Sequence, residues 1–173
     1  MDHESKFTAA PTNIRAMYRV LASPDELPLF SETTPGLSGE SDLPQGHGLS
    51  EAVAAFLVDL SRKMDHVISL LTTDRLAEEF PGKAQVSEIS GAWAVIRSDG
   101  PLAQGQHLEM VFVLSRMPLS LAGAVGRVTA ARQKGDGYDA RIEFTSIRSS
   151  DQEALVQFVF HEQRQQIRAA KWE

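Results

Sequence analysis

Residues 107–128, which read HLEMVFVLSRMPLSLAGAVGRV, decide the fold of this chain. The runs HLEMVFVL and SLAGAVGRV are rich in alternating or β-favouring residues, and SRMP between them has the length of a hairpin loop. Three more such runs surround them, namely KAQVSEI, AWAVIRS and YDARIEFTSI. Five strands joined by short loops predict an antiparallel meander over residues 81–149. The meander must close into a barrel or be covered, because its edge strands would otherwise expose unpaired backbone groups.

A long helix is predicted immediately before these strands, over residues 49–80. Ser50 is a suitable N-cap, and Phe80-Pro81-Gly82 ends the helix because proline disfavours helical geometry in the residue before it. Between these ends, large apolar residues recur at alternating spacings of four and three, which is the seam of a heptad repeat. The seam consists of Val53, Leu57, Leu60, Met64, Val67 and Leu71, and Leu49, Phe56 and Ile68 widen it.

The length of this helix suggests a partner. Residues 49–78 at roughly 1.5 Å each would extend about 45 Å, which exceeds the width of a small barrel, so part of the helix must overhang. The apolar stripe can pack on the sheet of its own chain, as most amphipathic helices do. Its length and register favour self-association instead, in a bundle of two to four chains. The predicted interface is Val53, Phe56, Leu57, Leu60, Met64, Val67 and Leu71.

The remaining segments are assigned from composition and periodicity. In the N-terminal segment 1–30, TNIRAMYRVL at 12–21 is compatible with a first strand or with a helix. Residues 31–48 are rich in Ser, Gly, Pro and acidic side chains and predict a flexible linker, because they bury little apolar surface. Residues 150–173 predict a C-terminal helix that opens on Ser150-Asp151-Gln152-Glu153, which has the spacing of a capping box.

Composition excludes several classes of protein. The net charge of −6 opposes extended binding to nucleic acid, which draws its affinity from a basic surface, although a few arginines suffice for one small phosphorylated ligand. Cysteine is absent, so disulfides, thiolate metal sites and cysteine nucleophiles are excluded. No apolar run reaches the roughly 20 residues that span a bilayer, and MDHESKFTAAP lacks the apolar core of a signal peptide. A cytoplasmic protein with no membrane insertion is expected.

Catalytic and metal-binding motifs are weak, so we expect no enzyme and no metal site. There is no Gly-x-Ser-x-Gly elbow. His161-Glu162 begins like a metalloprotease helix, but Gln165 stands where the second histidine ligand is needed. Gly135-Asp136-Gly137 lies between two strands and predicts a hairpin turn in preference to a phosphate loop. An enzyme with dispersed catalytic residues is kept only as a minor alternative.

Two short patterns are suited to a phosphorylated ligand. Arg15 and Arg19 form an Arg-x-x-x-Arg pair, whose guanidinium groups suit forked bonds to phosphate or to a guanine edge. Such pairs are common by chance, and on an exposed segment the simpler reading of this one is two solvated arginines. The second pattern is the step SEISGAW at 87–93, which enters the strand AWAVIRS and is either a ligand-binding turn or only the bend before that strand.

The segment from about Lys83 to Arg168 resembles the PilZ domain family. The resemblance rests on the step from Glu88 to Trp93, on HLEMVFVLSRMPLSLAGAVGRV, and on GYDARIEFTSIRSSDQEALVQFVFHEQRQQIR. It implies a six-stranded antiparallel barrel that receives cyclic di-GMP or, in degenerate members, serves as an interaction module without it. A long heptad helix beside the barrel is similar to the atypical subgroup of this family, whose members form tetramers through such helices and lack ligand residues.

The ligand motif of the family is carried over residue by residue. It is Arg-x-x-x-Arg near the first strand and Asp/Asn-x-Ser-x-x-Gly at the next. Arg15 and Arg19 have the arginine spacing, and Ser90 matches the serine, whereas Glu88 stands where Asp or Asn is usual and Trp93 replaces the glycine. A tryptophan does not readily adopt positive φ, and its ring would fill the space where the ligand approaches the backbone.

The expected function is therefore a non-enzymatic, homo-oligomeric PilZ-type protein in cyclic di-GMP-linked regulation, with a tetramer favoured and a protein partner. No cofactor is expected, and its nucleotide site would be degenerate. The alternative is a genuine cyclic di-GMP receptor that uses Arg15, Arg19, Glu88 and Ser90 in an altered pose.

Overall fold

The computed structural model describes residues 7–30, 48, 50–116 and 118–171, so all but one residue of the predicted linker 31–48, together with Leu49, lie outside it. Six strands and two helices follow one another along the chain. They are β1 Ala9–Val20, α1 Glu51–Glu79, β2 Gly82–Ser90, β3 Trp93–Ser98, β4 His107–Arg116, β5 Leu119–Lys134, β6 Gly137–Ser146 and α2 Ser149–Ala170. The structure is mostly β, as the sequence predicts.

The strands form one antiparallel sheet in the order β1-β2-β3-β6-β5-β4, and β1 also pairs with β4, so the sheet closes into a barrel. The prediction of a meander was wrong at one connection, because β4 pairs with β1 across the barrel and leaves β3 to pair with β6. The segment that was compatible with strand or helix is thus β1. Ala16 and Tyr18 of β1 are buried while Arg15 is exposed, which is the period-two pattern of a strand with one face inside. The β5–β6 hairpin turns at Gly135, whose φ of 61° is readily adopted only by glycine.

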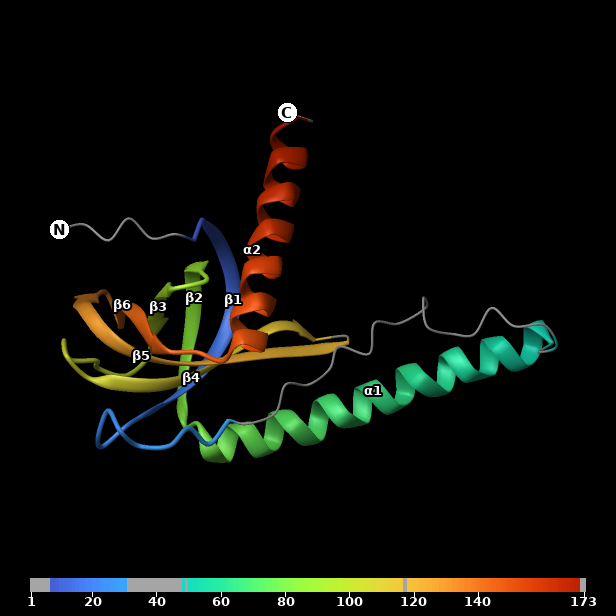
Figure 1. Ribbon diagram of the computed structural model, residues 1–173, viewed down its shortest axis with the longest axis horizontal. Coiled ribbons are helices and arrows are strands. Elements are labelled where there is room, and N and C mark those ends of the chain that lie inside the picture. The colour runs from blue at the N-terminus through green and yellow to red at the C-terminus, as the bar shows by residue number, and fades with distance from the viewer. Residues whose placement is uncertain (1–6, 31–47, 49, 117, 172–173) are drawn as a thin grey trace.

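The main core fills the inside of the barrel, and α2 covers one of its open ends (Figure 1). Side chains such as Met110, Phe112 and Ile142 are fully buried there, and Leu155 and Val159 of α2 join them. The apolar side of α2 therefore completes the core that the strands begin. Beyond these residues α2 projects from the barrel, and its last turns are exposed.

The prediction of a capping box at Ser150 was wrong. α2 begins at Ser149 with Arg148 as its N-cap, and the Arg148 side chain makes no capping hydrogen bond. Asp151 explains the difference, because it is 1% exposed and accepts a 2.6 Å hydrogen bond from Nε of Arg148. A buried carboxylate is costly without a cation, so the pairing with Arg148 fixes the start of the helix.

A second, smaller core anchors α1 to the outside of the barrel. Leu76 and the C-cap Phe80 pack there with Phe30 and with outward-facing Val111 of β4 and Leu121 of β5. At the other end of α1, the Ser50 hydroxyl accepts a hydrogen bond from the N–H of Val53, as expected of an N-cap. Figure 1 shows that only the C-terminal end of α1 lies against the barrel and that the rest projects away from it.

Candidate functional site

The turn between β2 and β3 contains the serine and tryptophan singled out in the sequence. Ser90 is fully buried, and its hydroxyl accepts hydrogen bonds from the N–H groups of Ala92 and Trp93, both at 3.1 Å. The same hydroxyl lies 3.3 Å from the carbonyl of Trp93 and donates to it. Ser90 therefore closes its own turn, and its hydrogen-bonding capacity is committed to backbone groups.

The backbone of this turn is covered by the same chain. Gln152 of α2 donates a 3.1 Å hydrogen bond to the carbonyl of Gly91. A Cβ added at Gly91 would lie 2.7 Å from the Phe7 ring and 2.9 Å from a methyl of Val156. Glycine is needed here because Phe7 and α2 pack directly on the backbone.

Trp93 and Glu88 flank this turn on the outer surface of the barrel. The guanidinium carbon of Arg141 lies 3.9 Å from the centre of the Trp93 ring, which is a cation–π contact. The Arg141 Nε also lies 3.9 Å from a carboxylate oxygen of Glu143. Glu88 is half-buried on β2, opposite Val95 of β3. Trp93 is thus stacked under an arginine that sequence reasoning did not select.

The two predicted arginines lie away from the turn. Arg15 is exposed and pairs with Gln85, five residues before Ser90 on β2, which corresponds to roughly 16 Å along a strand. Arg19 lies farther still, because the pairing of β1 with β2 already ends at Tyr18 and Gly82. The fold therefore brings Ser90 and Trp93 together, with Glu88 nearby, but it does not bring either arginine to them.

Arg19 instead belongs to a network on the outer face of β1 and β4. Its Nε donates a 2.6 Å hydrogen bond to Glu109, and its Nη atoms bond Glu26 and the carbonyl of Leu27. Burial by itself lowers the pKa of Arg19, but its hydrogen bonds and Coulomb attraction to the two glutamates outweigh burial and raise that pKa. The same contact with Arg19, and then the N–H of Ala22, lower the pKa of Glu26. This arginine holds the segment after β1 against the barrel.

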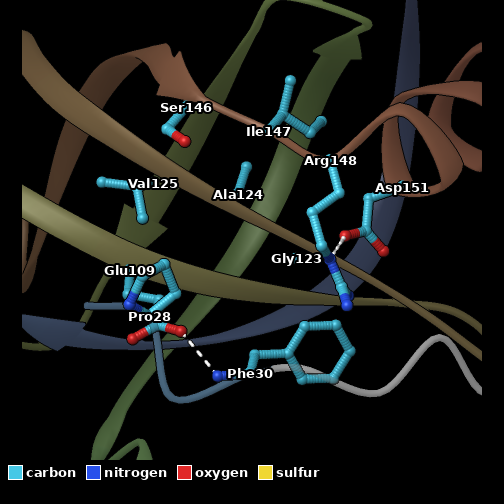
Figure 2. Close-up of a pocket in the computed structure, with 10 residues that line it drawn as sticks. All are labelled: Pro28, Phe30, Glu109, Gly123, Ala124, Val125, Ser146, Ile147, Arg148 and Asp151. Carbon is cyan, nitrogen blue, oxygen red and sulfur yellow. Dashed lines mark hydrogen bonds and ion pairs between the residues drawn. The ribbon is translucent and has the colours of Figure 1, made fainter.

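A small pocket lies beside this network, between the segment ending at Phe30 and the start of α2 (Figure 2). Its volume is about 50 Å³, which has room for a few waters but is far below the roughly 300 Å³ of a small-molecule site. Its walls are Pro28, Phe30, Glu109, Gly123, Ala124, Val125, Ser146, Ile147, Arg148 and Asp151. The pocket is therefore too small for a cyclic dinucleotide.

The polar groups of the pocket mostly serve the fold. Glu109 is 1% exposed and accepts the Phe30 N–H at 2.8 Å on the oxygen that Arg19 does not use. The Phe30 ring packs on Gly123 and lies 5.3 Å from the guanidinium carbon of Arg148 (Figure 2). One carboxylate oxygen of Asp151 has no hydrogen-bond partner among the described residues. These contacts hold the segment that ends at Phe30 against the barrel, and we call them the clasp.

Sequence reasoning missed the two buried acids, Glu109 and Asp151, and the stacked Arg141. For Glu109 a signal was present, since it is the only charged residue in the apolar run HLEMVFVL. A charge inside such a strand needs a buried partner, but the sequence does not say that the partner is Arg19. Asp151 gave no comparable signal, because an acidic residue in the first turn of a helix is ordinary.

The predicted interface residues of α1 are all solvent-exposed in the single chain. Their exposed fractions run from 38% at Leu57 to 67% at Leu71. Leu76, which is buried against the barrel, follows Leu71 by five residues and so lies roughly 140° around the helix from it. The apolar seam and the anchored side are therefore different faces of α1.

Among the described residues, neither a cluster of metal ligands nor a membrane-spanning helix is present. These residues contain no group of three or more histidine, aspartate or glutamate side chains placed to hold a metal ion. Neither α1 nor α2, as far as the structure describes them, has a stretch with the length and apolarity needed to traverse a bilayer.

Comparison with known proteins gives matches by structure alone, because no protein-family model and no curated protein sequence matches the chain. A tetrameric PilZ domain from Xanthomonas campestris, described as self-assembled via a helical bundle, superposes with a TM-score of 0.59. It is 18% identical, and the match covers 94% of this chain and 91% of that one. The inhibitor of motility MotI/DgrA of Bacillus subtilis superposes with a TM-score of 0.51 at 11% identity. That match covers 95% of this chain but only 53% of the Bacillus chain.

Proposed function

We propose that this chain, which has the PilZ fold, is a non-enzymatic cytoplasmic interaction module of cyclic di-GMP-linked regulation that assembles through α1 into a homotetramer. The observation that carries the proposal is the exposed apolar seam of α1. In solution as a single chain, the helix would present six large apolar seam residues to water on a face that its own barrel does not cover. Contiguous apolar surface of this kind marks an association site.

The width of the apolar face favours more than two helices. With Leu57, Met64 and Leu71 at one core position and Val53, Leu60 and Val67 at the other, Phe56, Ile68 and Leu70 occupy flanking positions of the repeat. These three are 41–64% exposed. A two-stranded coil usually places charged residues at the flanking positions, whereas a larger bundle buries these positions and can accept apolar residues there. The helical bundle of the Xanthomonas tetramer supports the same arrangement by analogy of fold.

The test of assembly is light scattering of the purified chain at micromolar concentration. We expect a mass of four times the 19.0 kDa of one chain. Leu60→Glu places a charge in the seam and should dissociate the assembly, because a buried unpaired carboxylate is strongly unfavourable. Arg62→Glu is the matched control, since Arg62 lies on the opposite side of the same helical turn and should leave the mass unchanged. A monomeric wild-type chain would sink the proposal.

The nucleotide site is proposed to be degenerate. Three features support this: the Ser90 hydroxyl is committed to its own turn, Gly91 is covered by Phe7 and α2, and both arginines lie elsewhere. Calorimetric titration with cyclic di-GMP is therefore expected to give no saturable binding. Tight binding that Arg15→Ala abolishes would overturn this reading in favour of the alternative, a receptor that uses Arg15 and Arg19 with Glu88 and Ser90.

A further inference from the structure

The outer surface of three adjacent strands is cationic although the chain is acidic. β3, β6 and β5 carry five cations and two carboxylates, which gives five minus two, or a net charge of +3. Because the whole chain has a net charge of −6, the remainder carries −9. Asp136, in the turn between β5 and β6, offsets one of the cations. We call this surface the cationic face, and its cations are Arg97, Arg127, Arg132, Lys134 and Arg141.

The helices leave most of this face free. α1 packs on β1, β4 and β5, and α2 packs on β1, β2 and β5, so β3 and β6 lack an extensive cover among the described residues. In Figure 1, β3 and β6 lie on the side of the barrel away from the free end of α1. A partner could therefore reach the cationic face whether or not α1 is bundled.

The cations at one end of the face are undercompensated. Asp139 lies 3.5 Å from Arg97, 3.9 Å from Arg132 and 3.7 Å from Lys134, so three positive charges share one carboxylate. The carbonyl of Lys134 accepts a 2.9 Å hydrogen bond from Arg97. The Arg97 side chain also lies against Gly137, where an added Cβ would be 3.0 Å from the Arg97 Nε. The hairpin thus orients Arg97 without neutralising it.

These cations contribute little to the fold. Where this chain uses an arginine structurally, as in the pairs Arg19–Glu109 and Arg148–Asp151, the distance is 2.6 Å and the carboxylate is 1% exposed. On the cationic face the distances are 3.5–3.9 Å, and the four cations in these pairs are 41–75% exposed. Exposed ion pairs at such distances contribute little to stability, so folding does not explain why the cations gather here.

Trp93 gives the face a rigid aromatic centre. Its ring lies on β3 under the guanidinium of Arg141, with Glu143 beside them. Stacking restricts both side chains before any partner arrives, which lowers the entropy that binding must overcome. Tryptophan and arginine are also the residues most enriched among those that dominate the affinity of protein interfaces.

We infer that the cationic face is the docking surface for an acidic segment of a partner protein. This inference deepens the proposed function and rests on it, because it names the partner of the interaction module. Arginine forks suit carboxylates, and the face spans only three strands, which matches a short segment. A long polyanion such as nucleic acid would also meet the −9 of the rest of the chain, which disfavours it.

The probe is a short glutamate-rich peptide without aromatic residues, and the comparison probe is the same peptide with glutamine in place of glutamate. The chain has two tryptophans, so Trp172→Phe leaves Trp93 as the only tryptophan whose fluorescence can report binding. We expect the glutamate peptide to change Trp93 fluorescence saturably and the glutamine peptide to leave it unchanged. Binding should weaken as salt is added, since the interaction is between exposed charges.

Charge reversal locates the binding surface. Arg132→Glu with Lys134→Glu changes two of the most exposed cations of the face and should weaken peptide binding by about tenfold or more. Arg164→Glu with Arg168→Glu makes the same change of charge on the exposed end of α2 and should have little effect. Calorimetry repeats both titrations without relying on fluorescence.

Three outcomes would overturn the inference: no binding of the glutamate peptide, equal weakening by both double variants, or binding of inorganic polyphosphate in place of the peptide. Light scattering of each variant separates these failures from a failure of the proposed function. If the chain remains a tetramer but does not bind the peptide, the assembly stands and the docking surface does not.

Discussion

At the scale of single residues, Arg19 shows how position changes the role of a side chain. In the sequence it completes an Arg-x-x-x-Arg pair, whereas in the structure it joins β1 to Glu109 of β4 and to Glu26 of the following segment. A guanidinium held by two carboxylates is not available to a phosphate without breaking that network. Its role is to fasten the segment that leads toward α1.

Glu26 makes this role testable by pH. Its pKa is lowered below the ordinary value of 4.5, so the ionised form is favoured in the folded chain. A depressed pKa adds stability that is fully present above the unfolded value and is lost as the pH falls through the folded value. Urea unfolding should therefore show Glu26→Gln less stable than wild type at pH 7. The difference should shrink below pH 4.5 and vanish in stronger acid. A difference that does not depend on pH would contradict the ion-pair role.

The sequence allowed part of the candidate site to be predicted. Ser90 and Trp93 are neighbours on a turn, and a turn is a local feature that short-range pattern reveals. The distance from Arg15 to Ser90 depends on the register between β1 and β2, and the two strands are separated by the linker and all of α1. Register across such a separation is set by packing of the whole barrel, so the spacing of the arginines gave no guide to their position.

At the scale of elements, the segment ending at Phe30 and the helix α1 act together. Phe30 shares a core with Leu76 and Phe80, and its ring fills the space above Gly123 of β5. The sequence predicted α1 well because its apolar period is local and persistent, and it predicted the individual strands for the same reason. It did not predict their order, because the pairing of β3 with β6 joins segments that are distant in the chain. It did not predict the clasp by Phe30, because Leu27, Leu29 and Phe30 lack any regular period.

Gly123→Ala tests the clasp. The added Cβ would lie 2.3 Å from the Phe30 ring, so Phe30 must move, and we expect a loss of about 1–3 kcal/mol in the free energy of unfolding. Phe30→Ala should destabilise the chain on its own by removing a ring that is 7% exposed. In the double variant the methyl added at position 123 no longer meets the ring. The loss in free energy of unfolding of the double variant, measured by denaturant unfolding, should therefore be clearly less than the sum of the losses in the two single variants. Strict additivity would show that the two groups do not touch.

At the scale of the whole molecule, the cationic face and the anchor of the projecting helix lie on different parts of the barrel. The sheet arrangement places the cationic face on β3, β6 and β5, while the anchor of α1 lies on β4 and β5. The overhang of α1 was predictable from helix length alone, since a helix of 29 residues exceeds the width of a small barrel. The direction in which it projects was not predictable, because it depends on Leu76 and Phe80 packing on the outer surface of particular strands.

The seam of α1 stops at Leu71, nine residues before Phe80, and this spacing has a consequence for avidity. Nine residues of helix correspond to about 13 Å, so a bundle formed by the seam would hold each barrel at a stand-off from the common axis. Several cationic faces would then be displayed around one assembly at fixed separations. A partner with repeated acidic segments would bind the second segment at a high effective concentration once the first is held. Weak single contacts would in this way add up to selective capture of multivalent partners.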